Sequence, residues 1–113
     1  MRVEVASVSR VFGALSDPTR LAIVARLAQG EATVKELTEP FELTQQAVSL
    51  HLKTLESAGL VTRRKVGRAR PARLEVDRLI EATGWIDACR QEWLERHQRL
   101  AVHLASLQDA ERR

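Results

Sequence analysis

The sequence has few of the residues that cross-link small domains or build reactive centres. Its 113 residues include one cysteine, three histidines, three prolines and no tyrosine. One cysteine cannot form an internal disulfide, so we expect a compartment that keeps thiols reduced. Three scattered histidines and a lone cysteine supply neither a metal centre nor a nucleophile with its base. The composition therefore argues against an enzyme and predicts no cofactor.

Long apolar runs are also missing. No segment approaches the roughly 20 apolar residues that cross a bilayer, and Glu4 interrupts the apolar residues near the N-terminus, so residues 1–7 do not resemble a signal peptide. We therefore expect a cytoplasmic protein that makes no membrane contact. The hydrophobic content of 44% suffices for one compact core. Short connections and the absence of repeats favour a single domain over residues 1–113.

The first half of the chain predicts helices with clear boundaries. Apolar residues recur at helical spacing over residues 8–15, and Asp17 and Pro18 suit the cap and first turn of a second helix that Gly30 closes. Thr33 and Glu36 form the T-x-x-E pattern of a capping box, which begins a third helix that should end at or before Glu39.

A fourth helix is predicted over residues 45–58, capped by Thr44 and ended by Gly59. Val48, Leu52 and Leu55 share a narrow arc of its helical wheel. The opposite side carries short polar residues, one cation and one leucine: Gln46, Ser49, Leu50, Lys53 and Ser57. Such a face suits the major groove of DNA. An ordinary solvated helix face would have the same pattern, and the helix alone does not separate these readings.

A basic hairpin is predicted next. Residues 60–66 form one strand, residues 67–70 the turn and residues 71–76 the return, with Leu74 and Val76 on one face. From Lys53 to Arg73 the chain has seven basic residues and one acid, a formal charge of +6. The cations of the hairpin are Arg63, Arg64, Lys65, Arg68, Arg70 and Arg73. Basic residues also protect exposed strand edges from aggregation, but their place after a polar helix favours contact with nucleic acid.

The C-terminal segment predicts a long helix over residues 77–113, capped by Asp77. Leu79, Ile86, Trp93, Leu100 and Leu107 recur every seven residues, and Trp85, Cys89 and Leu104 widen the stripe. Within it, Cys89 is expected to be a buried small apolar residue, and Thr83-Gly84 is a possible break. The stripe could fold back on the first helix, but we favour a second copy of the chain. The predicted dimer contacts are Val8, Val11, Phe12, Leu79, Ile86, Cys89, Trp93, Leu100, Leu104 and Leu107.

Together these segments predict a mainly α fold with a small β-hairpin wing (α+β), a winged helix-turn-helix. Over most of residues 8–76 the sequence resembles the winged-helix repressors of the ArsR/SmtB type. The resemblance is carried by residues 17–23, 33–37, 46–55 and 58–64, which include the segments D-P-T-R-L-A-I, T-V-K-E-L, Q-A-V-S-L-H-L-K-T-L and A-G-L-V.

This resemblance implies a homodimeric transcriptional regulator, usually a repressor, that binds a palindromic operator in double-stranded DNA. It implies that residues 8–76 bind DNA and that residues 77–113 dimerise together with the N-terminal helix. The recognition helix is then Gln45–Ser57 and the wing Arg63–Arg73. The expected DNA contacts are Thr44, Gln45, Gln46, Ser49, Leu50, Lys53, Arg63, Arg64, Lys65, Arg68, Arg70 and Arg73.

The sequence departs from the family pattern at several positions, and these departures limit which functional residues the resemblance implies. Residues 34–38 hold no Cys-x-Cys pair, and the nearest frame for a metal site on the last helix has Gln108 in place of a histidine. We therefore predict no metal site. Leu50 stands where relatives often have a basic residue, and Glu42 where glycine is frequent. His51 lies near the apolar arc of its helix. We expect its side chain to be half-buried and to cap or bridge structural elements rather than to read a base.

A second function class remains open. The chain could be a winged-helix protein-interaction module that uses its apolar C-terminal helix and never touches DNA. The +6 segment argues against this alternative. No residue pattern identifies a small-molecule effector.

Overall fold

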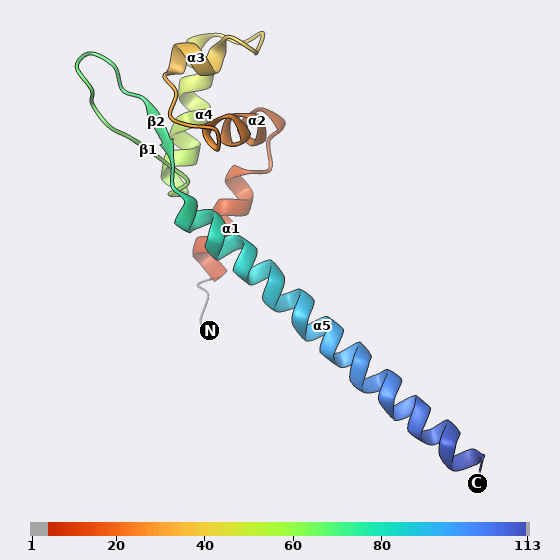
Figure 1. Ribbon diagram of the computed structural model, residues 1–113. Helices are drawn as coiled ribbons and strands as arrows, with labels where there is room; N and C mark the ends of the chain where they lie inside the picture. The colour runs from red at the N-terminus through yellow and green to blue at the C-terminus, as the bar shows by residue number, and fades with distance from the viewer. Residues whose placement is uncertain (1–4, 113) are drawn as a thin grey trace. The chain divides into compact units, whose positions relative to one another are not determined.

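The computed structural model describes residues 5–112, which form five helices and one hairpin (Figure 1). In chain order the elements are α1 (Val5–Ala14), α2 (Pro18–Leu27), α3 (Val34–Thr38), α4 (Gln45–Ser57), β1 (Val61–Arg63), β2 (Ala72–Leu74) and α5 (Val76–Glu111). This mainly helical architecture with one antiparallel hairpin confirms the predicted fold class. The chain divides into two compact units, one ending at Ala82 and the other beginning at Thr83.

Helix caps set the boundaries of the first unit, as the sequence predicts. The Asp17 carboxylate accepts from the N–H of Arg20 at 3.1 Å, and Pro18 opens α2. Thr33 and Glu36 form both bonds of the capping box at α3. The Thr44 hydroxyl accepts from the N–H of Ala47 at 3.1 Å and begins α4. These bonds satisfy donors that the first turn of a helix otherwise leaves without a partner.

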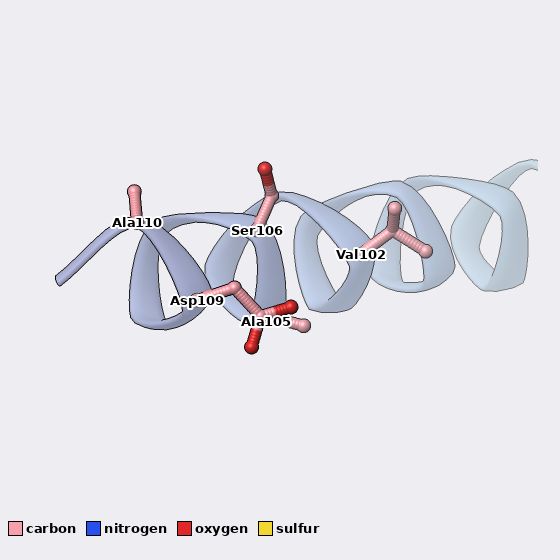
Figure 2. Close-up of a pocket in the computed structure, with 5 residues that line it drawn as sticks. All are labelled: Val102, Ala105, Ser106, Asp109 and Ala110. Carbon is pink, nitrogen blue, oxygen red and sulfur yellow. The ribbon is translucent and has the colours of Figure 1, made fainter. Parts of the chain in front are cut away.

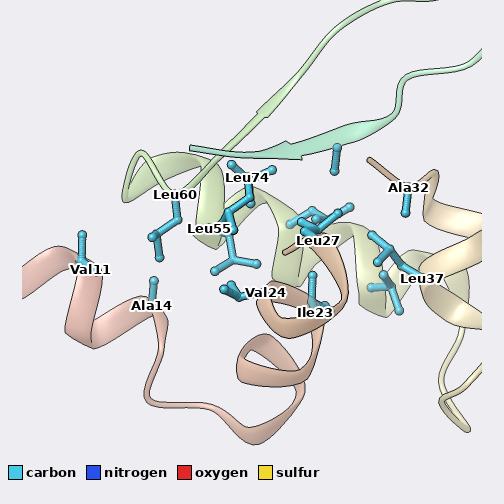
Figure 3. Close-up of a cluster of buried hydrophobic side chains, with 14 of the residues drawn as sticks. Val11, Ala14, Ile23, Val24, Leu27, Ala32, Leu37, Leu55, Leu60 and Leu74 are labelled. Carbon is cyan, nitrogen blue, oxygen red and sulfur yellow. The ribbon is translucent and has the colours of Figure 1, made fainter. Parts of the chain in front are cut away.

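The core of the first unit lies between α1, α2, α3, α4 and the hairpin (Figure 3). Its largest fully buried side chains are Ile23, Leu37, Leu52, Leu55, Leu60, Val11, Val48 and Val61. Phe41, between α3 and α4, packs against this core. Leu43 does not, since its side chain remains 39% exposed just before the cap of α4.

The hairpin strands are shorter than predicted. Val61 pairs with Leu74 and Arg63 with Ala72, and the two strands end there because Pro71 has no N–H to donate to the next pair. On its other edge Ala72 forms a bridge with Ala32, through N–H to O distances of 2.8 and 3.2 Å. The outer edge of β2 is therefore closed at Ala72.

The turn of the hairpin is tighter than the predicted four residues. Val66 and Ala69 exchange backbone hydrogen bonds of 2.9 and 3.0 Å, which leaves Gly67 and Arg68 as the loop. Gly67 has a φ of +59°, and no non-glycine residue among those described has a positive φ. That combination is typical of a type II′ turn, which places glycine first. Glu42, which stands where relatives often have glycine, therefore does not have a left-handed backbone conformation.

Helix α5 begins one residue earlier than predicted, so Asp77 lies in its first turn and is not its cap. Glu75 is held to the hairpin: its N–H donates to the Leu60 carbonyl at 2.8 Å, and its carboxylate accepts from the Thr62 hydroxyl at 2.7 Å. Val76 therefore opens the helix and is exposed, which corrects its predicted place in the second strand. The helix continues through Thr83-Gly84 without a break.

Membrane-crossing helices are not found in the part of the chain that the structure describes, because no helix there combines the necessary length with sufficient apolar character.

Candidate nucleic-acid interface

Helix α4 separates its side chains into two faces. Val48, Leu52 and Leu55 are fully buried in the core, which confirms the predicted inner arc. Of the polar face, Gln46, Leu50 and Lys53 are exposed and Ser49 is half-buried. Leu50 leaves 61% of its surface open to solvent. Ahead of this face, Thr44 and Gln45 are also exposed at the start of the helix.

A hydrogen-bond network joins α4 to α1 and α2. The guanidinium of Arg20 donates to the carbonyl oxygens of Ala14 at 2.6 Å and Gly13 at 3.5 Å, and its Nη1 lies 3.3 Å from Nδ1 of His51. The same ring nitrogen lies 4.0 Å from the Asp17 carboxylate. The bond from the N–H of Arg20, followed by the charge of His51, lowers the pKa of Asp17 below its ordinary value. His51 is therefore half-buried and structural, as predicted.

The basic residues of the hairpin divide into two groups. Arg64 forms an ion pair with Glu31 at 3.2 Å, and Arg63 donates from Nε and Nη2 to the carbonyl oxygen of Arg70. The other side chains are exposed and form no ion pair within residues 5–112; we call them the wing cations: Lys65, Arg68, Arg70 and Arg73. Arg68 is the second residue of the turn. The tip of the hairpin therefore carries positive charge that no acidic side chain within residues 5–112 balances.

Helix α4 and the hairpin are neighbours in the first unit. Helix α4 contacts β1 directly, and the hairpin loop projects beyond the strands in Figure 1. The sequence did not predict the parts of Arg20 and Glu31 in holding this arrangement. Their partners lie 31 and 33 positions away in the chain, and no local pattern marks such a pairing.

The predicted dimer contacts fall into two sets. Val8 and Val11 are 2% and 0% exposed, so they pack within their own chain; their assignment to a dimer surface is wrong. Phe12 and Leu79 are partly buried against the same core. On α5, by contrast, the predicted contacts are exposed in the single chain: Ile86, Cys89, Trp93, Leu100, Leu104 and Leu107. Cys89 is exposed in the single chain, and its burial within a dimer stripe stays a prediction.

No metal centre is assembled in residues 5–112, where no three histidine, cysteine or acidic side chains gather around a common point. The residues at the family's metal positions do not fit a thiophilic ion, since α3 has no thiol or imidazole. On α5 the ring of His97 stacks on Trp93, with ring centres 3.5 Å apart. The hollow lined by Val102 and Asp109 has only one helix as its wall (Figure 2), so it cannot enclose a ligand.

A helix-turn-helix followed by a basic hairpin defines the winged helix-turn-helix class of DNA-binding domains. Residues 15–64 match the family described as "Helix-turn-helix domain". The arsenic resistance transcriptional regulator ArsR1 of Pseudomonas putida is 40% identical over 89 residues, which cover 74% of this chain and 69% of that protein. The chain belongs to the ArsR/SmtB family of transcriptional regulators, which are not enzymes.

Other relatives agree with this assignment. The HTH-type transcriptional regulator Rv2034 of Mycobacterium tuberculosis is 45% identical over 69 residues, covering 61% of this chain and 64% of that protein. The chain thus spans about two thirds of the length of these two relatives. Family members named as repressors include the arsenical resistance operon repressor of Bacillus subtilis, 47% identical over 57 residues, or 50% of this chain and 54% of that protein.

Solved structures share the fold. The ArsR-like transcriptional regulator from Rhodococcus sp. RHA1 superposes with a TM-score of 0.76 at 30% identity, covering 84% of this chain and 90% of that chain. The winged helix-turn-helix DNA-binding domain of Mb0332 from Mycobacterium bovis, described as homodimeric, superposes with a TM-score of 0.62 at 31% identity, covering 80% of this chain and 84% of that chain. The similarity therefore extends from the helix-turn-helix to the whole architecture.

Proposed function

We propose that this chain is a homodimeric transcriptional repressor that binds a palindromic operator and does not sense metal ions. The observation that carries the proposal is the combination of a polar face on α4 with the exposed wing cations of a hairpin whose first strand contacts α4. Because Lys65, Arg68, Arg70 and Arg73 lack acidic partners within residues 5–112, their charge is available to phosphates.

The proposed contacts divide by chemistry. Gln46 and Ser49 carry the hydrogen-bonding groups that read base edges in a major groove, and Leu50 offers an apolar contact to a thymine methyl group. Lys53 and the wing cations bind phosphates, which supply affinity without sequence information. Arg63, Arg64, Thr44 and Gln45 belong to the same predicted surface. Arg63 and Arg64 are already bonded within the chain, and the hydroxyl of Thr44 is bonded in its cap.

The proposed dimer places two such surfaces on one duplex. The exposed apolar side chains of α5 need a partner, and a second copy supplies an identical stripe. The homodimeric state of the Mycobacterium bovis neighbour supports this arrangement. A twofold dimer of this class reads two half-sites about 34–36 Å apart, which is why a palindrome is expected.

The operator can be obtained by selecting bound duplexes from a random pool and measuring affinity by fluorescence anisotropy. We expect a palindrome bound with nanomolar affinity that falls steeply with salt. Gln46→Ala should change the preferred sequence, whereas Arg68→Gln should weaken binding to all sequences alike. Arg112→Gln, which removes a charge at the end of the chain, is the matched control and should bind as wild type.

Two outcomes would count against the proposal. If the purified protein bound no duplex even at low salt, the protein-interaction module would become the better assignment. If a selected palindrome were released on adding zinc or arsenite, the protein would be a metal sensor despite lacking the expected ligands.

A further inference from the structure

The wing has a weak point in its backbone ladder. The register that pairs Arg63 with Ala72 and Val66 with Ala69 places Pro71 opposite Arg64. Proline has no N–H, so only the bond from the N–H of Arg64 to the Pro71 carbonyl joins the arms there, and it is long at 3.4 Å. Backbone pairing therefore secures the root and the tip of the wing but not its middle.

One side chain crosses this gap. The Nε and Nη2 groups of Arg63 donate to the carbonyl oxygen of Arg70 at 3.2 and 3.1 Å. Arg63 is half-buried, whereas Lys65, Arg68 and Arg70 are exposed. A guanidinium is suited to this position because its N–H groups form a rigid fork, and hydrogen bonds from a charged donor are stronger than neutral ones.

We propose that Arg63 is a positioning residue of the wing: by bonding the Arg70 carbonyl it joins the two arms where Pro71 interrupts the ladder, and so holds Lys65, Arg68 and Arg70 in place for phosphate contact. This inference rests on the proposed DNA binding and changes the role of one residue within it. Arg63 then acts on DNA through the shape of the wing, while the wing cations touch the phosphates.

The substitution Arg63→Lys separates the two roles. Lysine keeps the positive charge and can bind a phosphate, but its single ammonium group cannot reproduce the two-donor fork. The matched control is Arg10→Lys, which makes the same change at an exposed position of α1 that lies outside the proposed DNA surface.

The first measurement needs no DNA. Backbone order parameters from ¹⁵N relaxation of the full chain report how rigid the wing is. We expect residues 65–70 to fall from about 0.8 in wild type to about 0.6 or less in Arg63→Lys, with α4 unchanged as an internal reference for folding. Arg10→Lys should leave these values as in wild type. Unchanged order parameters in Arg63→Lys would overturn the proposal, whatever the protein does with DNA.

The second measurement is the affinity for the selected operator across a salt series. Arg63→Lys should weaken binding about tenfold, and the salt slope should fall by about 1.8 if each wing of the dimer loses one phosphate contact. Arg10→Lys should bind as wild type, because it alters no group of the proposed DNA surface. A mobile wing in Arg63→Lys with wild-type affinity would overturn the positioning role. Failure of the wild-type protein to bind any duplex would instead refute the proposed function.

Discussion

The two units of the chain use their apolar side chains in opposite ways. All the buried hydrophobic residues in the described part of the chain lie at or before Ala82, where helices and the hairpin cover one another. Beyond it, Ile86, Trp93 and Leu100 are 49%, 57% and 55% exposed. Helices of both units are amphipathic, but only the first unit assembles its apolar faces into a buried core. An amphipathic pattern thus shows that a face needs covering and does not show what covers it.

The largest expected effect is a loss of stability in the first unit. Leu52→Ala should lower the free energy of unfolding by about 3 kcal/mol, because Leu52 is 0% exposed and its truncation leaves a cavity in a packed core. Leu50→Ala, two residues away on the same helix, removes a side chain that is 61% exposed. It should change the free energy of unfolding by about 0.5 kcal/mol or less. Urea denaturation at one fixed protein concentration measures both. Equal losses in the two variants would show that the two faces of α4 are assigned wrongly.

The next effect concerns the second unit and appears as a change in association. Leu100→Ala should raise the dissociation constant of the dimer about a hundredfold, because each copy loses apolar surface and the symmetry counts the loss twice. Ser106→Ala, an exposed site on the same helix, is the matched control. Sedimentation velocity over a concentration series gives the constants. An unchanged dimer in Leu100→Ala would remove this stripe from the interface.

The sequence predicts best where the deciding interaction is local. Asp17, Thr33 and Thr44 cap their helices as expected, because a cap depends on residues three positions apart. The inner arc of α4 follows from helical periodicity in the same way. The fold class and the family could therefore be predicted before any coordinates were known.

Prediction failed where tertiary context decides. Val8 and Val11 form the apolar face of a short helix, and periodicity alone cannot distinguish a core face from a dimer face. The ion pair between Glu31 and Arg64 joins residues 33 positions apart, for which no sequence pattern exists. For the candidate site, the sequence predicts the helix, the hairpin and their charges. It does not predict which cations are already bonded within the fold, as Arg63 and Arg64 are.

A smaller effect is expected at the start of the recognition helix. Thr44→Ala should cost about 1 kcal/mol of stability, because the N–H of Ala47 then loses its acceptor at the first turn of α4. Thr44→Ser keeps the hydroxyl and should restore most of the loss, which the midpoint of urea unfolding will show. If serine and alanine were equally destabilising, the methyl group of Thr44 and not its cap would be the stabilising feature.

The smallest expected effect is a dependence of the stability of the first unit on pH. Hydrogen bonds from the N–H and then the hydroxyl of Thr33 lower the pKa of Glu36 below its ordinary value of 4.5. A carboxyl whose pKa is lower in the folded chain stabilises that chain fully at pH values above its unfolded pKa. The contribution is lost as the pH falls from about 4.5 through the folded pKa.

Glu36→Gln removes this titration while keeping a side chain that serves in a capping box. The variant should be slightly less stable than wild type at neutral pH, and the two should converge as the solution becomes more acidic than pH 4. Urea midpoints measured between about pH 7 and pH 3 test this. Because Glu36 lies in the first unit, the converging part of the acid response belongs to that unit. A constant difference between variant and wild type over the whole range would mean that the Glu36 charge has no part in holding α3.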